Sequence, residues 1–187
     1  MEIITIETLM IPIDEYATVS KEASLFEAVM ALEKAQEKLD RVKYLYLHRG
    51  VLVYDKNEKI IGKISQLDVL RALEPKYEEV GDIRTISRAG FSSQFLKSML
   101  ENYSLCDRTF SDMCSRGGEI KVKDFMYTPA GGEYIDVNDS LCEGIHQFVM
   151  GHHQSLLVTR EEEIVGILRL VDVFMDVFQM MKTTCEI

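Results

Sequence analysis

The chain has 187 residues, and its 47% hydrophobic and 28% charged content is typical of a folded globular protein rather than a disordered one. Its formal net charge of −10 disfavours non-specific binding to nucleic acid or to an anionic membrane surface. No stretch approaches the ~20 uncharged apolar residues that span a bilayer, and the first ten residues contain no Lys or Arg, unlike a signal peptide. We therefore expect a cytoplasmic protein whose partners include neither membranes nor nucleic acid.

The first part of the chain predicts alternating strands and helices. In chain order these are an extended stretch at 16–20, a helix over 23–32, an apolar strand at 52–54, a strand at 60–65 and a helix at 68–73. A charged turn, DKNEK, separates the second and third strands. The predicted order is β-α-β-β-α.

The last part of the chain predicts the same order again. Its elements are an extended stretch at 133–137, a helix over 139–148, strands at 156–159 and 164–170, and a helix at 172–181. In each half, a Ser followed three residues later by Glu opens the first helix with capping-box spacing: Ser24 with Glu27, and Ser140 with Glu143. The chain therefore contains an internal repeat.

The two repeats differ in length at one place. Thirty-five positions separate Glu27 from Gly62, whereas twenty-three separate Glu143 from Gly166, so the first repeat carries twelve extra residues. They fall between its first helix and its central strand, within EKAQEKLDRVKYLYLHRG.

We expect an α/β fold in which two pseudo-symmetric β-α-β-β-α repeats pack as one module joined by a helical connector. The boundaries are 1–75 for the first repeat, 76–121 for the connector and 122–187 for the second repeat. Within the connector, GFSSQFLKSMLENYSL predicts an amphipathic helix capped by Ser92 or Ser93. The connector either packs on the core or acts as a lid over a ligand.

The strand-to-helix junctions carry related heptads, Gly62-Lys-Ile-Ser-Gln-Leu-Asp68 and Gly166-Ile-Leu-Arg-Leu-Val-Asp172. A Met-containing segment precedes each repeat, LMIP from Leu9 and FMYTP from Phe125. This pattern resembles the CBS domain, named after cystathionine beta-synthase, and covers roughly residues 5–75 and 120–182.

The resemblance implies a regulatory module that binds AMP, ADP, ATP or another adenosyl ligand between its repeats, without catalysis. A carboxylate at Asp68 can accept hydrogen bonds from ribose hydroxyls, and Ser65 lies where a phosphate would meet the helix N-terminus. The alternative is that both residues only cap the helix. The resemblance also implies adenine contacts, largely through backbone groups, at the positions Thr18, Val19, Tyr134 and Ile135.

The second repeat departs from the pattern because Arg169 stands where Ser65 stands in the first. Arg169 either binds a phosphate as a charged donor, or it fills the cleft and bridges to Asp172, which would abolish binding there. One of the two expected ligand sites is therefore in question.

Other chemistry is weakly represented. The sequence contains no P-loop, GxSxG, HExxH or dinucleotide glycine motif, and no metal-ligand spacing among its four Cys and four His. We expect the thiols to be reduced and either buried or inert. We expect His48 with Arg49, and His152 with His153, to be solvated loop residues, with phosphate contact as the alternative.

The last predicted helix is apolar on nearly all sides, from Val171 to Met181. We expect a homodimer through this helix and the helix at 68–74, and the sequence does not identify a downstream protein target. The alternative function is a structural or dimerisation module whose ligand sites are empty or degenerate.

Overall fold

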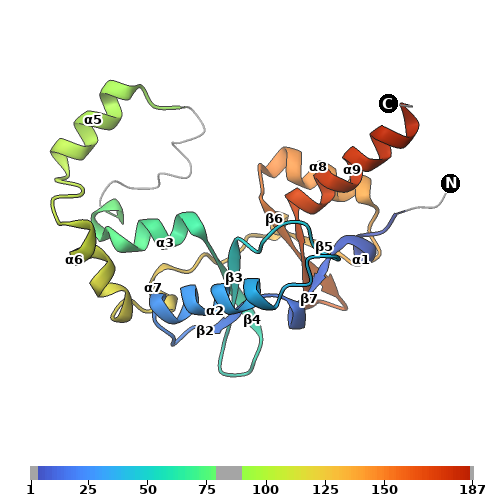
Figure 1. The fold of residues 1–187 in the computed structure, drawn as a ribbon, viewed down its shortest axis with the longest axis horizontal. Coiled ribbons are helices and arrows are strands. Elements are labelled where there is room, and N and C mark those ends of the chain that lie inside the picture. Colours follow the sequence, from blue (N-terminus) through green and yellow to red (C-terminus); the bar gives the residue numbers. More distant parts are fainter. Residues whose placement is uncertain (1–3, 79–89, 186–187) are drawn as a thin grey trace.

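A computed structural model describes residues 4–78 and 90–185, and it has the predicted α/β fold (Figure 1). Each repeat forms a small sheet and two helices in the order β-α-β-β-α. The first repeat comprises β2 (Thr18–Ser20), α2 (Leu25–Lys38), β3 (Gly50–Tyr54), β4 (Ile60–Ser65) and α3 (Gln66–Leu73). The second comprises β5 (Tyr134–Asp136), α8 (Leu141–Gly151), β6 (Ser155–Arg160), β7 (Glu163–Arg169) and α9 (Leu170–Thr184).

The two sheets have the same topology. In each repeat the first strand pairs parallel with the central strand, which pairs antiparallel with the third. The register also matches, because Gly50 lies opposite Ser65 in one sheet and Ser155 lies opposite Arg169 in the other. The predicted pseudo-symmetry is therefore confirmed in the backbone.

Both predicted capping boxes form. The Ser24 hydroxyl accepts the backbone N–H of Glu27 while the Glu27 carboxylate accepts the backbone N–H of Ser24, and Ser140 and Glu143 do the same at the start of α8. Each box satisfies two backbone donors that a helix N-terminus leaves unpaired. The predicted helix starts follow from this local chemistry.

The segments that enter the two repeats are exchanged. At the N-terminus, α1 (Ile6–Leu9) and β1 (Ile11–Pro12) pack on the second repeat, and β1 extends its sheet by pairing with β7. Residues leading into the second repeat, α7 (Val122–Phe125) and Tyr127, pack on the first repeat, and Tyr127 pairs with Lys63 of β4. Figure 1 shows the blue N-terminal segment lying beside the orange and red second repeat.

This exchange explains the two motif glycines. A Cβ on Gly62 would lie 3.0 Å from the carbonyl oxygen of Tyr127, and one on Gly166 would lie 2.6 Å from that of Ile11. The Met-containing segments pair alongside β4 and β7 at these positions, so a side chain on either glycine would press on the backbone of the paired segment. The glycine of each repeat thus lies against the Met-containing segment that precedes the other repeat.

The hydrophobic core has three parts. One lies in the first repeat and includes Val122, and one lies in the second repeat and includes Ile6, so each holds a residue from the exchanged segment. The third joins the repeats, because it packs Leu52 of β3 against Leu157 of β6 and Ile167 of β7. The repeats therefore share buried apolar surface and form one module.

The connector is helical, as predicted, and lies beside the first repeat (Figure 1). Its helices are α5 (Ser93–Asn102), capped by Ser92, and α6 (Phe110–Ser115), capped by Thr109. Short 3-10 turns are η1 (Ile13–Glu15), η2 (Pro75–Glu78), η3 (Arg116–Gly118) and η4 (Gly131–Glu133). The backbone N–H of Cys106 donates to the buried carboxylate of Glu74, which ties the connector to the end of α3.

Part of the extra length of the first repeat lies in α2, which has 14 residues against 11 in α8, and most of the rest forms an irregular loop, residues 39–49, between α2 and β3. Residues Leu39, Tyr44 and His48 of this loop are buried. These three side chains anchor the loop to the packed structure, whereas most of its other residues are exposed. Across 4–78 and 90–185, no helix is long and apolar enough to span a bilayer.

Candidate functional site

The first cleft lies where β4 ends and α3 begins. Ser65 is the N-cap of α3, and its hydroxyl accepts the backbone N–H of Asp68 at 3.2 Å. The Asp68 carboxylate accepts the backbone N–H of Ser65 at 2.9 Å and its hydroxyl at 2.7 Å. The two predicted residues are thus brought together as a capping box beside the positive end of a helix.

A small pocket opens next to this capping box. Its volume is about 160 Å³, and it is lined by Asp68, Arg71 and Ala72 from α3 and by residues 124–126 from the segment that enters the second repeat. Arg71 lies 3.9 Å from the Asp68 carboxylate. Asp68 is buried but borders an accessible space, so a small molecule in this pocket would meet the carboxylate.

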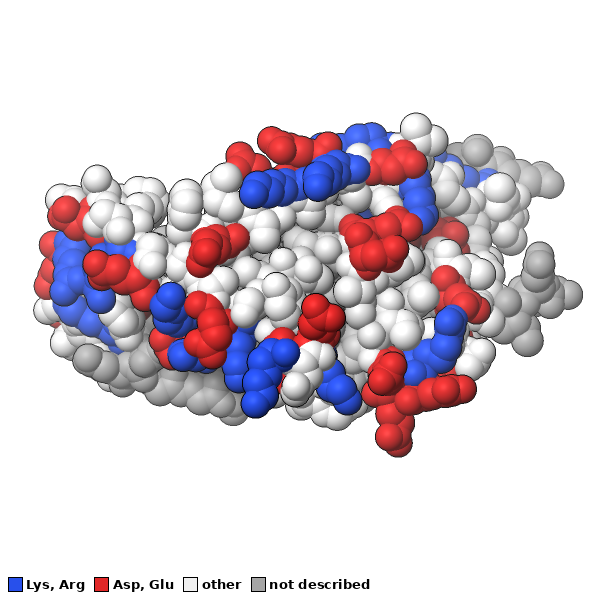
Figure 2. All heavy atoms as spheres, turned by 90° about the horizontal axis from the view of Figure 1, so that it is seen from below, with Lys and Arg blue, Asp and Glu red and all other residues white. Residues whose placement is uncertain are grey.

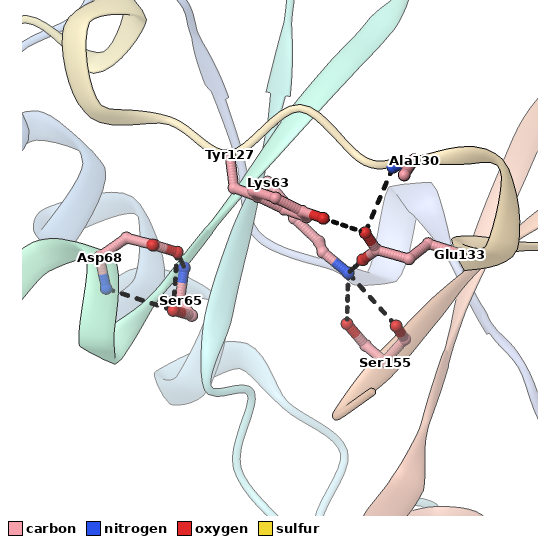
Figure 3. A network of polar contacts seen from close by, with 7 residues as sticks. All are labelled: Lys63, Ser65, Asp68, Tyr127, Ala130, Glu133 and Ser155. Carbon is pink, nitrogen blue, oxygen red and sulfur yellow. Dashed lines mark hydrogen bonds and ion pairs between the residues drawn. The ribbon is translucent and has the colours of Figure 1, made fainter. Parts of the chain in front are cut away.

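A buried ion pair lies beside the first cleft on the line where the repeats meet (Figure 3). The Lys63 ammonium lies 2.5 Å from the Glu133 carboxylate and donates to the carbonyl of Ser155 at 3.2 Å. Tyr127 donates its hydroxyl to Glu133, which also accepts the backbone N–H of Ala130. These contacts join β4 of the first repeat to the entry segment and β6 of the second.

The environment of Glu133 keeps its carboxylate ionised. Burial acts to raise the pKa of Glu133, but hydrogen bonds from Lys63 and Tyr127 and the Lys63 charge hold it below its ordinary value. Removing Lys63 would leave the buried Glu133 carboxylate without its counter-charge, which typically costs ~3–5 kcal/mol. The network therefore fixes the position of the two repeats relative to each other.

The second cleft, at the equivalent junction of β7 and α9, is filled by Arg169. Its guanidinium donates to both oxygens of Asp172, at 2.5 and 2.6 Å, and to the backbone carbonyl of Tyr46 at 3.0 Å. Arg169 is 5% exposed. Of the two alternatives for Arg169, the structure therefore shows the one in which it pairs with Asp172. A bidentate pair of this kind is a strong contact.

The loop 39–49 supplies the rest of the second cleft. His48 is fully buried. The prediction that it is a solvated loop residue is therefore wrong, because the inserted segment folds inward between the repeats. Its Nδ1 lies 3.3 Å from Arg169 and its Nε2 lies 3.1 Å from the carbonyl oxygen of Glu15. Since a guanidinium only donates, Nδ1 accepts and the Nε2–H donates to Glu15.

The four predicted adenine contacts lie in several places. Val19 and Ile135 are buried in the cores of their own repeats, and Tyr134 packs on the shared core. Thr18 borders a larger hollow of about 650 Å³ between α2 and the loop 39–49, whereas Asp68 borders the small pocket. Contacts from these four residues to a ligand stay a prediction.

Lys63 and Glu133 were not identified from the sequence as neighbours of the clefts, and His48 was noted only as a loop residue with phosphate contact as the alternative. Lys63, Glu133 and His48 acquire their partners from segments far away in the chain. The alternation of β4 places Lys63 and Ser65 on the same face of the strand, which is the one sequence signal that pointed to Lys63. His48 gave no comparable signal.

The thiols and histidines make no metal centre within the described residues. No group of three or more His, Cys, Asp or Glu could hold an ion there. All four cysteines are free, and they are exposed rather than buried. His152 is exposed and ends α8 in a left-handed conformation, with φ of 52°.

The CBS domain family model matches residues 6–75. No curated protein matches the chain in sequence. Among solved structures, a CBS domain-containing protein of unknown function from Bacillus anthracis is 17% identical with a TM-score of 0.62, and the alignment covers 94% of each chain. A putative acetoin utilization protein from Vibrio cholerae is 17% identical with a TM-score of 0.59, covering 100% of this chain and 98% of that one. CBSX2 in complex with AMP is 17% identical with a TM-score of 0.55, covering 94% of this chain and 97% of that one.

Proposed function

Because the chain is a CBS-domain protein, matched over residues 6–75 and with the fold of tandem CBS proteins throughout, we propose that it is a regulatory module that binds an adenosyl ligand in its first cleft. AMP, ADP and ATP are the leading candidates. The module acts without catalysis, as a cytoplasmic homodimer.

The observation that carries this proposal is the Asp68 carboxylate beside an accessible pocket at the start of α3. The Asp68 carboxylate is buried yet lines this pocket, so a ligand there would lie against it. Two vicinal ribose hydroxyls can donate to such a group, and a phosphate on the same ribose would meet Ser65 and the helix N-terminus. A similar fold, CBSX2, has been solved in complex with AMP, which supports the ligand class.

Asp68→Ala is the direct test. Loss of a hydrogen bond to a charged group typically costs ~1.5–3 kcal/mol, so we expect AMP affinity to fall by roughly 10- to 150-fold. Calorimetric titration of wild type and variant measures the change. Unchanged affinity would remove Asp68 from the site.

The substitution also removes a capping box, so it needs a matched control. Glu143→Ala breaks a box of the same kind at the start of α8, with the same hydrogen bonds between Ser140 and Glu143. Both variants should lose stability, because each removes the carboxylate that accepts the N-cap backbone N–H, but only Asp68→Ala should lose affinity. Equal affinity losses would indicate a general loss of structure.

A second candidate is an interaction module whose clefts bind nothing. The filled second cleft and the exposed apolar residues of α3 and α9 favour this alternative. A thermal-shift panel of AMP, ADP, ATP, adenosine and S-adenosylmethionine separates the two, because a ligand of the native state raises its stability by mass action. No shift with any of the five would favour the interaction module.

A further inference from the structure

We infer that the loop 39–49 occupies the second cleft as an intramolecular ligand, so that this cleft is closed to external heterocycles until the loop leaves. The inference rests on the proposed function in one respect, namely that the second cleft is the pseudo-symmetric equivalent of the first. It adds a regulatory property that the first cleft does not have.

The His48 imidazole makes the set of contacts that recognises a planar nitrogen heterocycle. Both ring nitrogens are hydrogen-bonded, one to Arg169 and the other to the backbone carbonyl of Glu15. The ring centroid lies 4.4 Å from that of Tyr16, with the planes inclined by 58°. The side chain is completely buried, so the space that it fills is unavailable to any other ring.

The charged groups of the second cleft also pair with each other. The guanidinium of Arg169 and the carboxylate of Asp172 neutralise each other through two hydrogen bonds. A ribose would have to compete with Arg169 for Asp172, and a phosphate would have to compete with Asp172 for Arg169. Either competition breaks charge-assisted bonds that are about twice as strong as neutral ones.

The loop is held at several points beyond His48. Gln36 of α2 donates to the backbone carbonyl of His48 at 2.7 Å, and Tyr46 donates its hydroxyl to the sulfur of Met175 on α9 at 3.3 Å. Tyr44 donates to the Glu15 carboxylate at 2.6 Å, and that carboxylate also binds Lys43. These contacts join the loop to α2, to the entry segment and to α9, so loop release would change three elements together.

Substitution of His48 by glycine tests the inference with imidazole as the probe. Glycine leaves a cavity of the shape of the lost ring, lined by the carbonyl of Glu15 and the guanidinium of Arg169. We expect imidazole to raise the melting temperature of His48→Gly by roughly 5–11 °C at about 100 times its Kd, and to leave the wild type unchanged. His152→Gly is the control, because His152 is exposed and already has a positive φ that suits glycine.

Two measurements on the wild-type protein keep the inference open to refutation if His48→Gly does not fold. Diethyl pyrocarbonate should modify His48 far more slowly than His152, as followed by peptide mass spectrometry, and equal rates would overturn the inference. AMP should bind at one site per chain, and two sites of similar affinity would overturn it as well. Absence of any AMP binding would instead contradict the proposed function. The modification rates of His48 and His152 would still test whether the loop occupies the second cleft.

Arg169→Ser in an Asp68→Ala background provides the converse experiment. With the first cleft disabled, the double variant should regain AMP binding at the second cleft. Arg169 also holds the loop through the carbonyl of Tyr46 and Nδ1 of His48, so its loss frees the loop as well as the Asp172 carboxylate and space for a phosphate. Calorimetry of Asp68→Ala with and without Arg169→Ser measures this gain. A double variant that binds no better than Asp68→Ala, although it folds, would show that Arg169 does not block the second cleft.

Discussion

Burial of His48 links the second cleft to pH. Burial first, and then the Arg169 charge, lower the pKa of His48 below its ordinary 6.5, although the bond to Glu15 and the Asp172 charge act in the opposite direction. The folded protein therefore keeps His48 neutral at a pH at which the unfolded chain already binds a proton. Stability is consequently lost as the pH falls below about 6.5.

The contribution of His48 to the free energy of unfolding should rise with pH up to about 6.5 and then level off. One proton bound only by the unfolded chain contributes a slope of up to ~1.4 kcal/mol per pH unit. Urea unfolding of wild type and His48→Gln between about pH 5.5 and 7.5 measures this contribution as the difference between the two slopes. Identical slopes would contradict the assignment of the linkage to His48.

The sequence predicted the residues of each cleft that belong to local motifs, and it did not predict those that come from elsewhere. Ser65 and Asp68 were predictable because a capping box needs only residues three positions apart. Arg169 was recognised as a departure, and its pairing with Asp172 was one of two open alternatives. His48 was wrongly expected to be solvated, since its burial depends on how the insertion folds between the repeats.

At the scale of elements, the exchanged entry segments have a consequence for stability. Ile6 lies near the start of the chain, yet it is fully buried in the core of the second repeat. Its backbone N–H donates to the carbonyl of Asp139, just before α8. The N-terminal segment therefore stabilises the repeat that is farthest from it in the sequence.

Ile6→Ala should destabilise the protein by ~2–5 kcal/mol, because a large aliphatic side chain is removed from a closed core. Amide hydrogen exchange should show the loss of protection first in β6 and β7 rather than in β3 and β4. Val42→Ala is the control, since Val42 is 95% exposed and its truncation should change stability by no more than ~0.5 kcal/mol. Loss of protection confined to the first repeat would contradict the exchange.

The order and type of the elements followed from periodicity and caps, whereas the exchange did not. Alternation, apolar runs and the boxes at Ser24 and Ser140 are local signals, and the structure confirms the elements that they predicted. Nothing local indicates that β1 pairs with β7 and not with β4, because strand pairing depends on packing between distant segments. Gly62 and Gly166 mark the positions where the entry segments approach the sheets closely, but the sequence alone does not show which segment approaches which glycine.

The surface of the whole molecule is unevenly divided between charged and apolar regions. Acidic and basic side chains are interspersed on the face seen in Figure 2, with uncharged side chains between them. By contrast, α3 exposes Leu67 and Leu70, and α9 exposes Phe174, Phe178 and Met181. Large exposed apolar side chains gathered on a helix are typical of protein interfaces.

Phe174→Glu should convert the proposed homodimer into monomer or aggregate. Phe174 is 62% exposed and stacks on Phe178, with ring centroids 6.4 Å apart, so both rings would enter an interface formed by α9. A carboxylate placed there loses its hydration without gaining a partner, which costs several kcal/mol and hence more than a hundredfold in association. Phe110→Glu on the connector is the control, because Phe110 is 70% exposed but lies outside 68–74 and 171–181. Light scattering at micromolar concentration should show dimers for the wild type and for Phe110→Glu, but not for Phe174→Glu. A monomeric wild type would exclude the homodimer.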